Sequence, residues 1–352
     1  MHYLLPATSA FMLTVLVTAI ALKIFPKLGL LDRPEKYGLK RKSIPYPGGI
    51  LLYLVFLALA LMFFEPTVKL IGLLIGGGLL VVVSFIDDRV ELPPMLRLFI
   101  QLVVAAIMVV VGIGVSTITN PFGGYIPLDQ YKFLIQFGDI QITIMALSGL
   151  FTIIWIVLIV NTMNWMDGIP GMTSGITVIG GLTLFFLSIS PIVSQSETAT
   201  LALIVAMIAL GFWLFDFYPP KIIIGDSGSM LFGLLLAVLA IFSGGKIATA
   251  FLILGFPILD AIYVIIYRIY NRRAPWKGGE WDKYRKAVHL HHRLLKFGFS
   301  ERQALLSVYF VCAIFGVSAL FMGTWGKFWT IVALFGLTFI VGLVLRAKGK
   351  RD

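Results

Sequence analysis

The feature that most constrains this sequence is a series of long apolar segments that recur along its 352 residues. A helix needs roughly 20 mostly apolar residues to cross the hydrocarbon core of a bilayer. Eleven segments meet this requirement, at residues 4–25, 47–64, 68–86, 95–116, 142–160, 173–190, 198–217, 228–243, 247–270, 302–322 and 326–346. We therefore predict one all-α membrane domain over residues 1–352, with about eleven transmembrane helices.

Composition supports a polytopic membrane protein. Only 13% of the residues are charged, against about a quarter in soluble domains. This excludes a soluble globular enzyme, a disordered chain and a free-standing nucleic-acid-binding domain, so the expected partner is the lipid bilayer and no nucleic acid. The net charge of +11 then belongs to loops that face anionic headgroups. A homodimer is compatible with the sequence.

The basic residues predict the orientation. If the N-terminus lies outside and the segments alternate, the inner loops and the C-terminus hold 24 of the 28 Lys and Arg residues. Cytoplasmic loops carry such an excess, which makes the C-terminus cytoplasmic. The first segment is expected to be a retained helix, because its basic residues follow the apolar run. We expect an integral protein of the cell (inner) membrane.

The acidic residues indicate chemistry at one membrane surface. Twelve of the 17 lie on the predicted inner side, and Asp260 alone lies well inside a segment, where we expect a buried structural acid. A transporter or flippase for a lipid-linked solute is the main alternative, but an ion relay would need ionisable residues near the midplane. The predicted active-site face consists of the inner loops 26–46, 87–97, 161–172, 216–227 and 271–301.

Two groups of oxygen-bearing side chains end predicted helices on this face. Asp87 and Asp88 are adjacent carboxylates, which repel each other unless a divalent metal, the neighbouring arginine or water offsets the charge. Asn161, Asn164 and Asp167 are spaced by three, which keeps them near one helical face. Their oxygens suit Mg²⁺ or the ribose and base of a nucleotide. The alternative for both groups is an ordinary helix cap.

A glycine-rich turn and a basic loop could bind phosphate. Residues 225–229 read Gly-Asp-Ser-Gly-Ser, which fits a phosphate or metal-phosphate nest, although Asp and Ser are also favoured as N-caps. The loop at residues 33–42 ends at Lys42 and could capture a lipid phosphate or a nucleotide. Its alternative is positive-inside charge alone.

Three of the four histidines lie within four residues. His289, His291 and His292 are followed by Arg293 in the large inner loop. A zinc site would need further ligands, and no cysteine accompanies the group. The adjacent arginine and the dense positive charge of the loop favour binding of a diphosphate.

Together these motifs resemble those of the polyprenyl-phosphate N-acetylhexosamine-1-phosphate transferases, the glycosyltransferase 4 family. The resemblance spans about residues 26–310 and includes the Gly-Leu-Leu-Asp-Arg-Pro run at 29–34, residues 44–50, the motifs above, residues 257–260 and the Gly-Phe-Ser at 298–300. It implies about ten or eleven transmembrane helices and a cytoplasmic active site. It also implies transfer of a sugar-1-phosphate from a UDP-N-acetylhexosamine to polyprenyl phosphate, such as undecaprenyl phosphate, with release of UMP. Such a reaction starts the synthesis of a cell-envelope glycan.

The resemblance also implies roles for single residues. Asp226 matches a ligand of Mg²⁺, for which Mn²⁺ could substitute, and Asn164 matches a second contributor. Asp87 and Asp88 match an aspartate pair assigned to the lipid phosphate, as catalytic residues. The remaining matched positions would bind substrate: Asn161, Asp167, His289, His291, His292, Arg293 and Lys42.

The histidine pattern indicates the branch, and one position departs from the family. The segment reads His-x-His-His-Arg-Leu, which is similar to the GlcNAc-1-phosphate transferases and less so to the phospho-MurNAc-pentapeptide transferases, the alternative within the family. Pro170 stands where the family usually has a second Asp that contacts the nucleotide. Proline offers no N–H and no side-chain oxygen, so this contact is lost or supplied elsewhere. A non-catalytic relative that binds polyprenyl phosphate is a further alternative.

Overall fold

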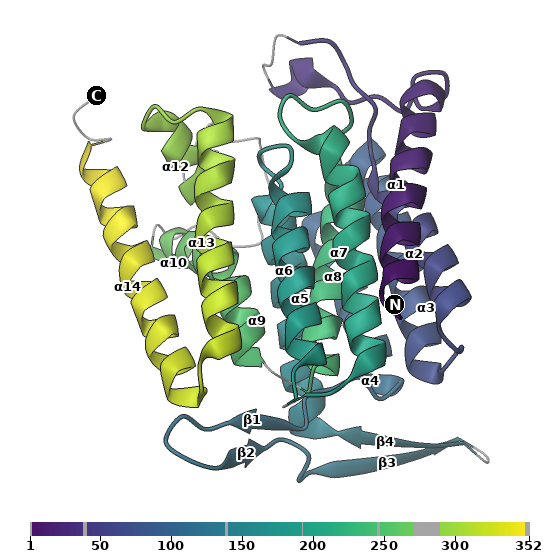
Figure 1. The fold of residues 1–352 in the computed structure, drawn as a ribbon, viewed down its shortest axis with the longest axis vertical. Coiled ribbons are helices and arrows are strands. Elements are labelled where there is room, and N and C mark those ends of the chain that lie inside the picture. The colour runs from purple at the N-terminus through teal and green to yellow at the C-terminus, as the bar shows by residue number, and fades with distance from the viewer. Residues whose placement is uncertain are drawn as a thin grey trace.

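The computed structural model describes residues 2–37, 41–137, 140–191, 193–244, 247–270 and 289–348. These residues form a bundle of long helices with two β-hairpins at one end (Figure 1). The helices are α1 (Leu4–Ile24), the 3₁₀ helix η1 (Pro34–Tyr37), α2 (Gly49–Phe63), α3 (Val68–Val90), α4 (Pro94–Val110), α5 (Ala146–Met166), α6 (Met172–Ile189), α7 (Ser196–Asp216), α8 (Gly225–Phe242), α9 (Ile247–Ile253), α10 (Gly255–Tyr270), α12 (Leu290–Lys296), α13 (Glu301–Phe321) and α14 (Thr324–Lys348). The strands are β1 (Thr117–Thr119), β2 (Tyr125–Pro127), β3 (Lys132–Phe137) and β4 (Ile140–Met145).

Helix α8 lies at the centre of the bundle. It packs against α2, α3, α5, α6, α7 and α9, and nearly every side chain after its first two residues is buried. A helix that is apolar on all sides is stable only when other apolar surface surrounds it. At Gly233 an added Cβ would lie 2.8 Å from the Cα of Val160, so glycine permits the close approach of α5 and α8. The shortest predicted segment is therefore the most enclosed.

The predicted helical fold is confirmed for the apolar segments. Seven helices among the described residues are long and apolar enough to cross a membrane, and the bent pair α9–α10 could make an eighth. Many large apolar side chains on α1, α3 and α13 are exposed, including Leu4, Met12 and Phe310. Such surface is stable next to lipid and unfavourable in water. The chain is thus a polytopic membrane protein, and the number of spans and their orientation stay predictions.

The all-α prediction was wrong for the segment between α4 and α5. This segment forms two antiparallel hairpins, β1–β2 and β3–β4, and the predicted span at 142–160 starts with strand residues and becomes helical only at Ala146. In β3–β4, Lys132 pairs with Met145 and Ile135 with Ile142. The apolar, β-branched residues of β4 raise the local hydropathy as a helix would, but they favour a strand.

The ninth predicted segment is broken rather than continuous. Helices α9 and α10 meet at Leu254 and are bent by 80°. Pro257 lies in the first turn of α10, where its ring and missing N–H prevent a regular helix from running through from Ile253. The bend redirects α10 away from the axis of α9.

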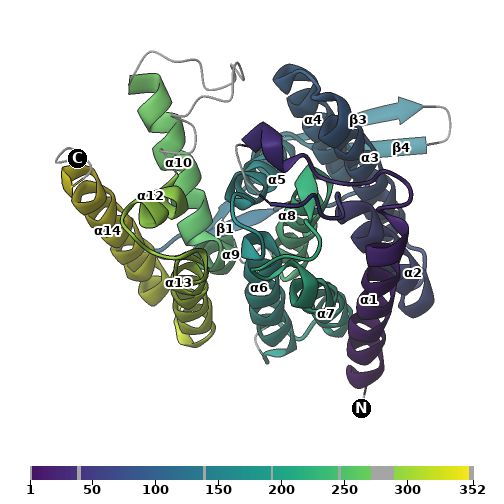
Figure 2. The ribbon, with the colours of Figure 1, turned by 90° about the horizontal axis from the view of Figure 1, so that it is seen from above.

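Four of the loops predicted on the inner side meet at the end of the bundle opposite the hairpins. The C-terminal ends of α1, α3, α5 and α7 and the N-terminal ends of α2, α4, α6 and α8 all lie there (Figures 1 and 2). Helix α12 lies at the same end, beside α13 and α14. Residues 271–288 of the fifth loop lie outside the described residues.

The orientation can be tested with single cysteines. Lys42 and Lys132 are exposed at opposite ends of the bundle, and the native Cys312 is buried and can be replaced by alanine throughout. In sealed vesicles of known sidedness, a membrane-impermeant maleimide should label Lys42→Cys only from the cytoplasmic side and Lys132→Cys only from the opposite side. Labelling of both from one side would contradict the bundle; reversed labelling would contradict the orientation.

Candidate active site

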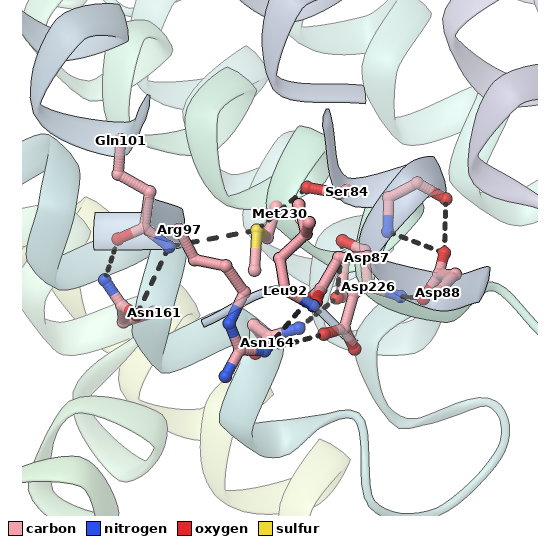
Figure 3. Close-up of polar contacts among 12 residues, drawn as sticks. Ser84, Asp87, Asp88, Leu92, Arg97, Gln101, Asn161, Asn164, Asp226 and Met230 are labelled. Carbon is pink, nitrogen blue, oxygen red and sulfur yellow. Dashed lines mark hydrogen bonds and ion pairs between the residues drawn. The ribbon is translucent and has the colours of Figure 1, made fainter. Parts of the chain in front are cut away.

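The turn between α3 and α4 brings the carboxylate of Asp87 next to the guanidinium of Arg97. One oxygen of Asp87 accepts a 2.6 Å hydrogen bond from the backbone N–H of Leu92, and the other lies 3.0 Å from Nη1 of Arg97 (Figure 3). Nη1 of Arg97 also lies 3.5 Å from a carboxylate oxygen of Asp226 at the start of α8. Two carboxylates from distant parts of the chain therefore share one guanidinium.

Asp88, the next residue, faces the N-terminus of α8. Its carboxylate accepts hydrogen bonds from the backbone N–H groups of Asp226 (3.1 Å) and Ser227 (3.4 Å), from the Ser227 hydroxyl (3.2 Å) and from the Tyr46 hydroxyl (2.5 Å). The first N–H groups of a helix have no partner within it and favour a negative charge. Asp88 thus occupies amides that the sequence suggested for phosphate, and its catalytic role stays a prediction.

The segment before α2 is hydrogen-bonded to the residues that lead into α8. The N–H groups of Gly48 and Gly49 donate to the carbonyls of Ile223 and Ile224. A Cβ on Gly49 would lie 2.1 Å from the backbone N of Gly228, so only glycine fits at this crossing. The conspicuous glycines of residues 44–50 are therefore explained by close packing against the turn that carries Asp226.

The asparagines of α5 lie beside this group and not in a loop. Asn161 exchanges hydrogen bonds with the Gln101 amide, of 2.6 Å and 3.4 Å. The Nδ2 of Asn164 donates to the hydroxyl of Ser229 at 3.2 Å, one turn along α8 from Asp226. Asn161 and Asn164 lie on the same face of α5, as predicted from their spacing, and this face is directed toward α4 and α8 (Figure 3).

Asp167 lies just after α5, close enough to Asp88 and Asp226 for their charges to act on it. It accepts a 3.0 Å hydrogen bond from the Thr173 hydroxyl, and desolvation, followed by the charge of Asp216, raises the pKa of Asp167 well above its ordinary value. Asp216 accepts from the backbone N–H of Gly171 (3.1 Å), directly after Pro170. The loop that carries Pro170 is therefore held by an acid from α7.

The histidine motif is anchored to α10 by Asp260. Its carboxylate lies 2.6 Å from Nδ1 of His289 and accepts a 2.6 Å hydrogen bond from the N–H of Leu290. Asp260 is buried and hydrogen-bonded, as expected from the sequence. These contacts favour an anchoring role for His289, and a direct substrate contact stays a prediction.

The other predicted substrate-binding residues lie at the same end of the bundle. Arg293 donates to the Tyr263 hydroxyl at 2.6 Å and lies over its ring, and the His292 ring is half-buried near His289. Lys42 is exposed. The side chain of His291 is outside the described part of the structure.

Sequence reasoning missed four residues of this region: Tyr46, Arg97, Gln101 and Asp216. In the sequence, Arg97 contributes only to the predicted excess of positive charge on the inner side. Its pairing could have been predicted, since a short turn with Pro93 and Pro94 returns α4 alongside α3 and places Arg97 near Asp87. The contacts of Tyr46 and Asp216 join segments far apart in sequence, so no local sequence pattern predicts them.

The donor set fits a hard divalent cation. Within the described residues, no three His, Cys, Asp or Glu side chains gather as a metal group. Mg²⁺, however, commonly binds proteins through one or two carboxylates and takes its other ligands from water and substrate phosphates. The Asp226 carboxylate, about a third exposed, and the nearby Asn164 amide supply oxygens of this kind.

Comparison with known proteins decides the family. Residues 70–244, from α3 to α8, match the sequence model of glycosyl transferase family 4. The chain belongs to this family. The matched part contains Asp87, Asp88, Asn164, Asp167 and Asp226, so the family region coincides with the cluster at the inner end of the bundle.

Family members of known name resemble the chain over most of its length. The "Probable undecaprenyl-phosphate N-acetylglucosaminyl 1-phosphate transferase" of Bacillus subtilis is 29% identical, covering 96% of this chain and 90% of the relative. The "Decaprenyl-phosphate N-acetylglucosaminephosphotransferase" of Mycobacterium tuberculosis is 29% identical (86% and 78%). The "Undecaprenyl-phosphate alpha-N-acetylglucosaminyl 1-phosphate transferase" of Escherichia coli O157:H7 is 26% identical (95% and 88%).

The contact at Gly49 predicts a stability effect. Gly49→Ala should lower the free energy of unfolding by about 2 kcal/mol, because the methyl group must displace backbone of the α8 turn. Gly77→Ala in α3 is the matched control, since its Cβ would meet only side chains at 3.6 Å or more. Thermal unfolding of both variants in detergent checks this. Equal midpoints for the two would contradict the close crossing.

Proposed function

We propose that this protein transfers N-acetylhexosamine-1-phosphate, with GlcNAc as the sugar, from a UDP-sugar to polyprenyl phosphate. The observation that carries the proposal is the convergence of Asp87, Asp226 and Arg97 beside Asn164, within the family region. The named relatives act as N-acetylglucosaminyl-1-phosphate transferases, which favours this branch over the phospho-MurNAc-pentapeptide branch. Family membership likewise favours a transferase over a transporter.

Asp226 and Asn164 would hold Mg²⁺. Once bound there, the ion would neutralise negative charge on the diphosphate of the donor. Asp226 has the accessibility that this role needs, because its carboxylate is partly exposed while that of Asp87 is buried. Asp88 would fix the turn that carries Asp226 through its hydrogen bonds to the first amides of α8.

The remaining polar residues would position the two substrates. His292 and Arg293 on α12, with His291, would bind phosphate oxygens of the donor, and Asp167 would face the nucleotide. Lys42, exposed on the loop after α1, would attract the phosphate of the lipid at the membrane surface. Asn161 would act through its amide pair with Gln101, which keeps α4 and α5 in register.

The reaction would be a direct displacement. An oxygen of the lipid phosphate attacks the β-phosphorus of the UDP-sugar, a new P–O bond forms, and the bond to the leaving UMP breaks. A phosphate monoester has a second pKa of about 6, so the attacking group is largely ionised at neutral pH. A strong general base is therefore not required, and Asp87, which is buried and paired with Arg97, would act by positioning that guanidinium.

The site would open toward the cytoplasm of the cell (inner) membrane, where nucleotide sugars are dissolved. Its residues lie at the end of the bundle that carries most of the described basic residues. The lipid acceptor would enter from the bilayer along the apolar helix surfaces. A soluble donor and a membrane-bound acceptor would thus meet at one surface.

The proposal is tested by release of UMP. Purified protein with Mg²⁺, undecaprenyl phosphate and UDP-GlcNAc should release UMP and form a lipid-linked GlcNAc diphosphate, detected by mass spectrometry. Asp226→Ala should lower turnover by at least about 100-fold, because an electrostatic contribution to the transition state is removed. Glu65→Ala, an exposed acid at the opposite end of the bundle, is the control and should keep wild-type turnover.

UDP-MurNAc-pentapeptide and other UDP-sugars belong in the same assay. UMP release with the pentapeptide donor and not with UDP-GlcNAc would contradict the proposed branch. Wild-type turnover in Asp226→Ala would remove this residue from the metal site.

A further inference from the structure

Arg97 occupies the space between the two carboxylates of the proposed site. Its Nη1 lies 3.0 Å from Asp87 and 3.5 Å from Asp226, with about a quarter of the Arg97 side chain exposed. Both carboxylates present one oxygen to the same guanidinium nitrogen. The positive charge of Arg97 thus reduces the repulsion between these two negative charges.

Other basic residues at this end have different partners. Arg41 pairs with Asp32, and Arg89 donates to the backbone carbonyls of Gly29 and Tyr46. Among the ion pairs between described residues, those that reach Asp87 and Asp226 come from Arg97. Arg97 thus makes defined contacts with both carboxylates, in addition to contributing to the positive charge at the membrane surface.

A divalent cation that binds Asp226 must compete with this guanidinium. Two cations that approach the same carboxylate oxygens repel each other over a few ångströms, and the partly exposed site screens that repulsion incompletely. Arg97 is on a long, flexible side chain, so it can swing away from the carboxylates while its backbone stays in α4. A guanidinium released in this way matches the geometry of phosphate oxygens.

We propose that Arg97 is the resident counter-ion of the metal site and a phosphate-binding residue once the site is loaded. Before substrates bind, it holds Asp87 and Asp226 together and weakens the affinity of Asp226 for a divalent cation. After the cation and the UDP-sugar bind, its guanidinium turns to the phosphate groups. This inference rests on the proposed function for its second half only, because the competition with a cation needs no substrate.

Mn²⁺ binding to the purified protein without substrates tests the competition. Arg97→Gln should bind Mn²⁺ about tenfold more tightly than the wild type, measured by electron paramagnetic resonance of free Mn²⁺, because the competing charge is gone. Arg97→Lys, which keeps a charge, should bind nearly as the wild type does. Arg89→Gln is the matched control, since it removes one positive charge from the same end without touching either carboxylate.

Turnover tests the second half. Despite tighter Mn²⁺ binding, Arg97→Gln should transfer sugar-1-phosphate at least about tenfold more slowly, because a charged hydrogen bond to phosphate is lost, and Arg97→Lys should restore part of the rate. A purely structural residue would lower both properties together.

The outcomes separate the two ideas. Equal or weaker Mn²⁺ binding in Arg97→Gln would overturn the counter-ion role, even if the wild type transfers GlcNAc-1-phosphate. Tighter binding with wild-type turnover would overturn the phosphate role. Absence of transfer by the wild type, with tighter Mn²⁺ binding in the variant, would defeat the proposed function and leave the counter-ion role intact.

A second measurement covers a variant that folds poorly. Without Arg97 the two carboxylates repel, and a ligand that binds only the folded state raises Tm. If Arg97→Gln is purified in Mn²⁺, its Tm should rise more between metal-free and Mn²⁺ buffer than the Tm of the wild type. An equal or smaller rise would overturn the counter-ion role.

Discussion

The carboxylate of Asp88 at the end of α3 caps the N-terminus of α8, and most of the inner end depends on this contact. It satisfies the first amides of a helix that is otherwise enclosed by apolar neighbours, where unpaired N–H groups would be costly. The same carboxylate accepts from Tyr46, which ties the segment before α2 to α3 and α8. Three elements far apart in sequence are thereby held at one point.

The position of Asp88 also determines the directions in which the side chains of Asp87 and Asp226 point. Because Asp87 precedes Asp88 on a helix, it points about 100° away, toward α4, and reaches Arg97. Asp226 lies in the capped turn itself, and its side chain reaches the same guanidinium. The electrostatic balance of the proposed metal site thus follows from a structural contact formed by a residue that does not itself need to touch a substrate.

Much of this arrangement could be predicted from the sequence, because membrane-spanning helices leave strong local signals. The apolar segments predicted the ends of the continuous helices to within six residues. Because successive segments alternate in direction, the prediction also placed Asp87, Asn164 and Asp226 at one end. The hairpins β1–β2 and β3–β4 were missed, since β-branched apolar residues next to a helix extend its hydropathy signal. The break at Leu254 was missed because hydropathy averages over a proline that interrupts a helix.

The site was less predictable than the fold, for a physical reason. Motifs identify residues that bear chemistry, but hydrogen bonds between distant segments decide which group faces which. The pairing of Asp260 with His289 and of Asp88 with the α8 amides turns two predicted substrate or catalytic positions toward the protein itself. Arg97, which lies outside every motif considered, joins the two acids that the motifs supplied separately.

The central role of Asp88 is tested most directly by amide hydrogen exchange in the segment 222–229. In Asp88→Ala, the N–H groups of Asp226 and Ser227 lose their acceptor, so this segment should exchange at least about tenfold faster than in the wild type. The middle of α6 serves as the internal reference and should keep its protection. Unchanged protection of the segment 222–229 in the variant would contradict the account.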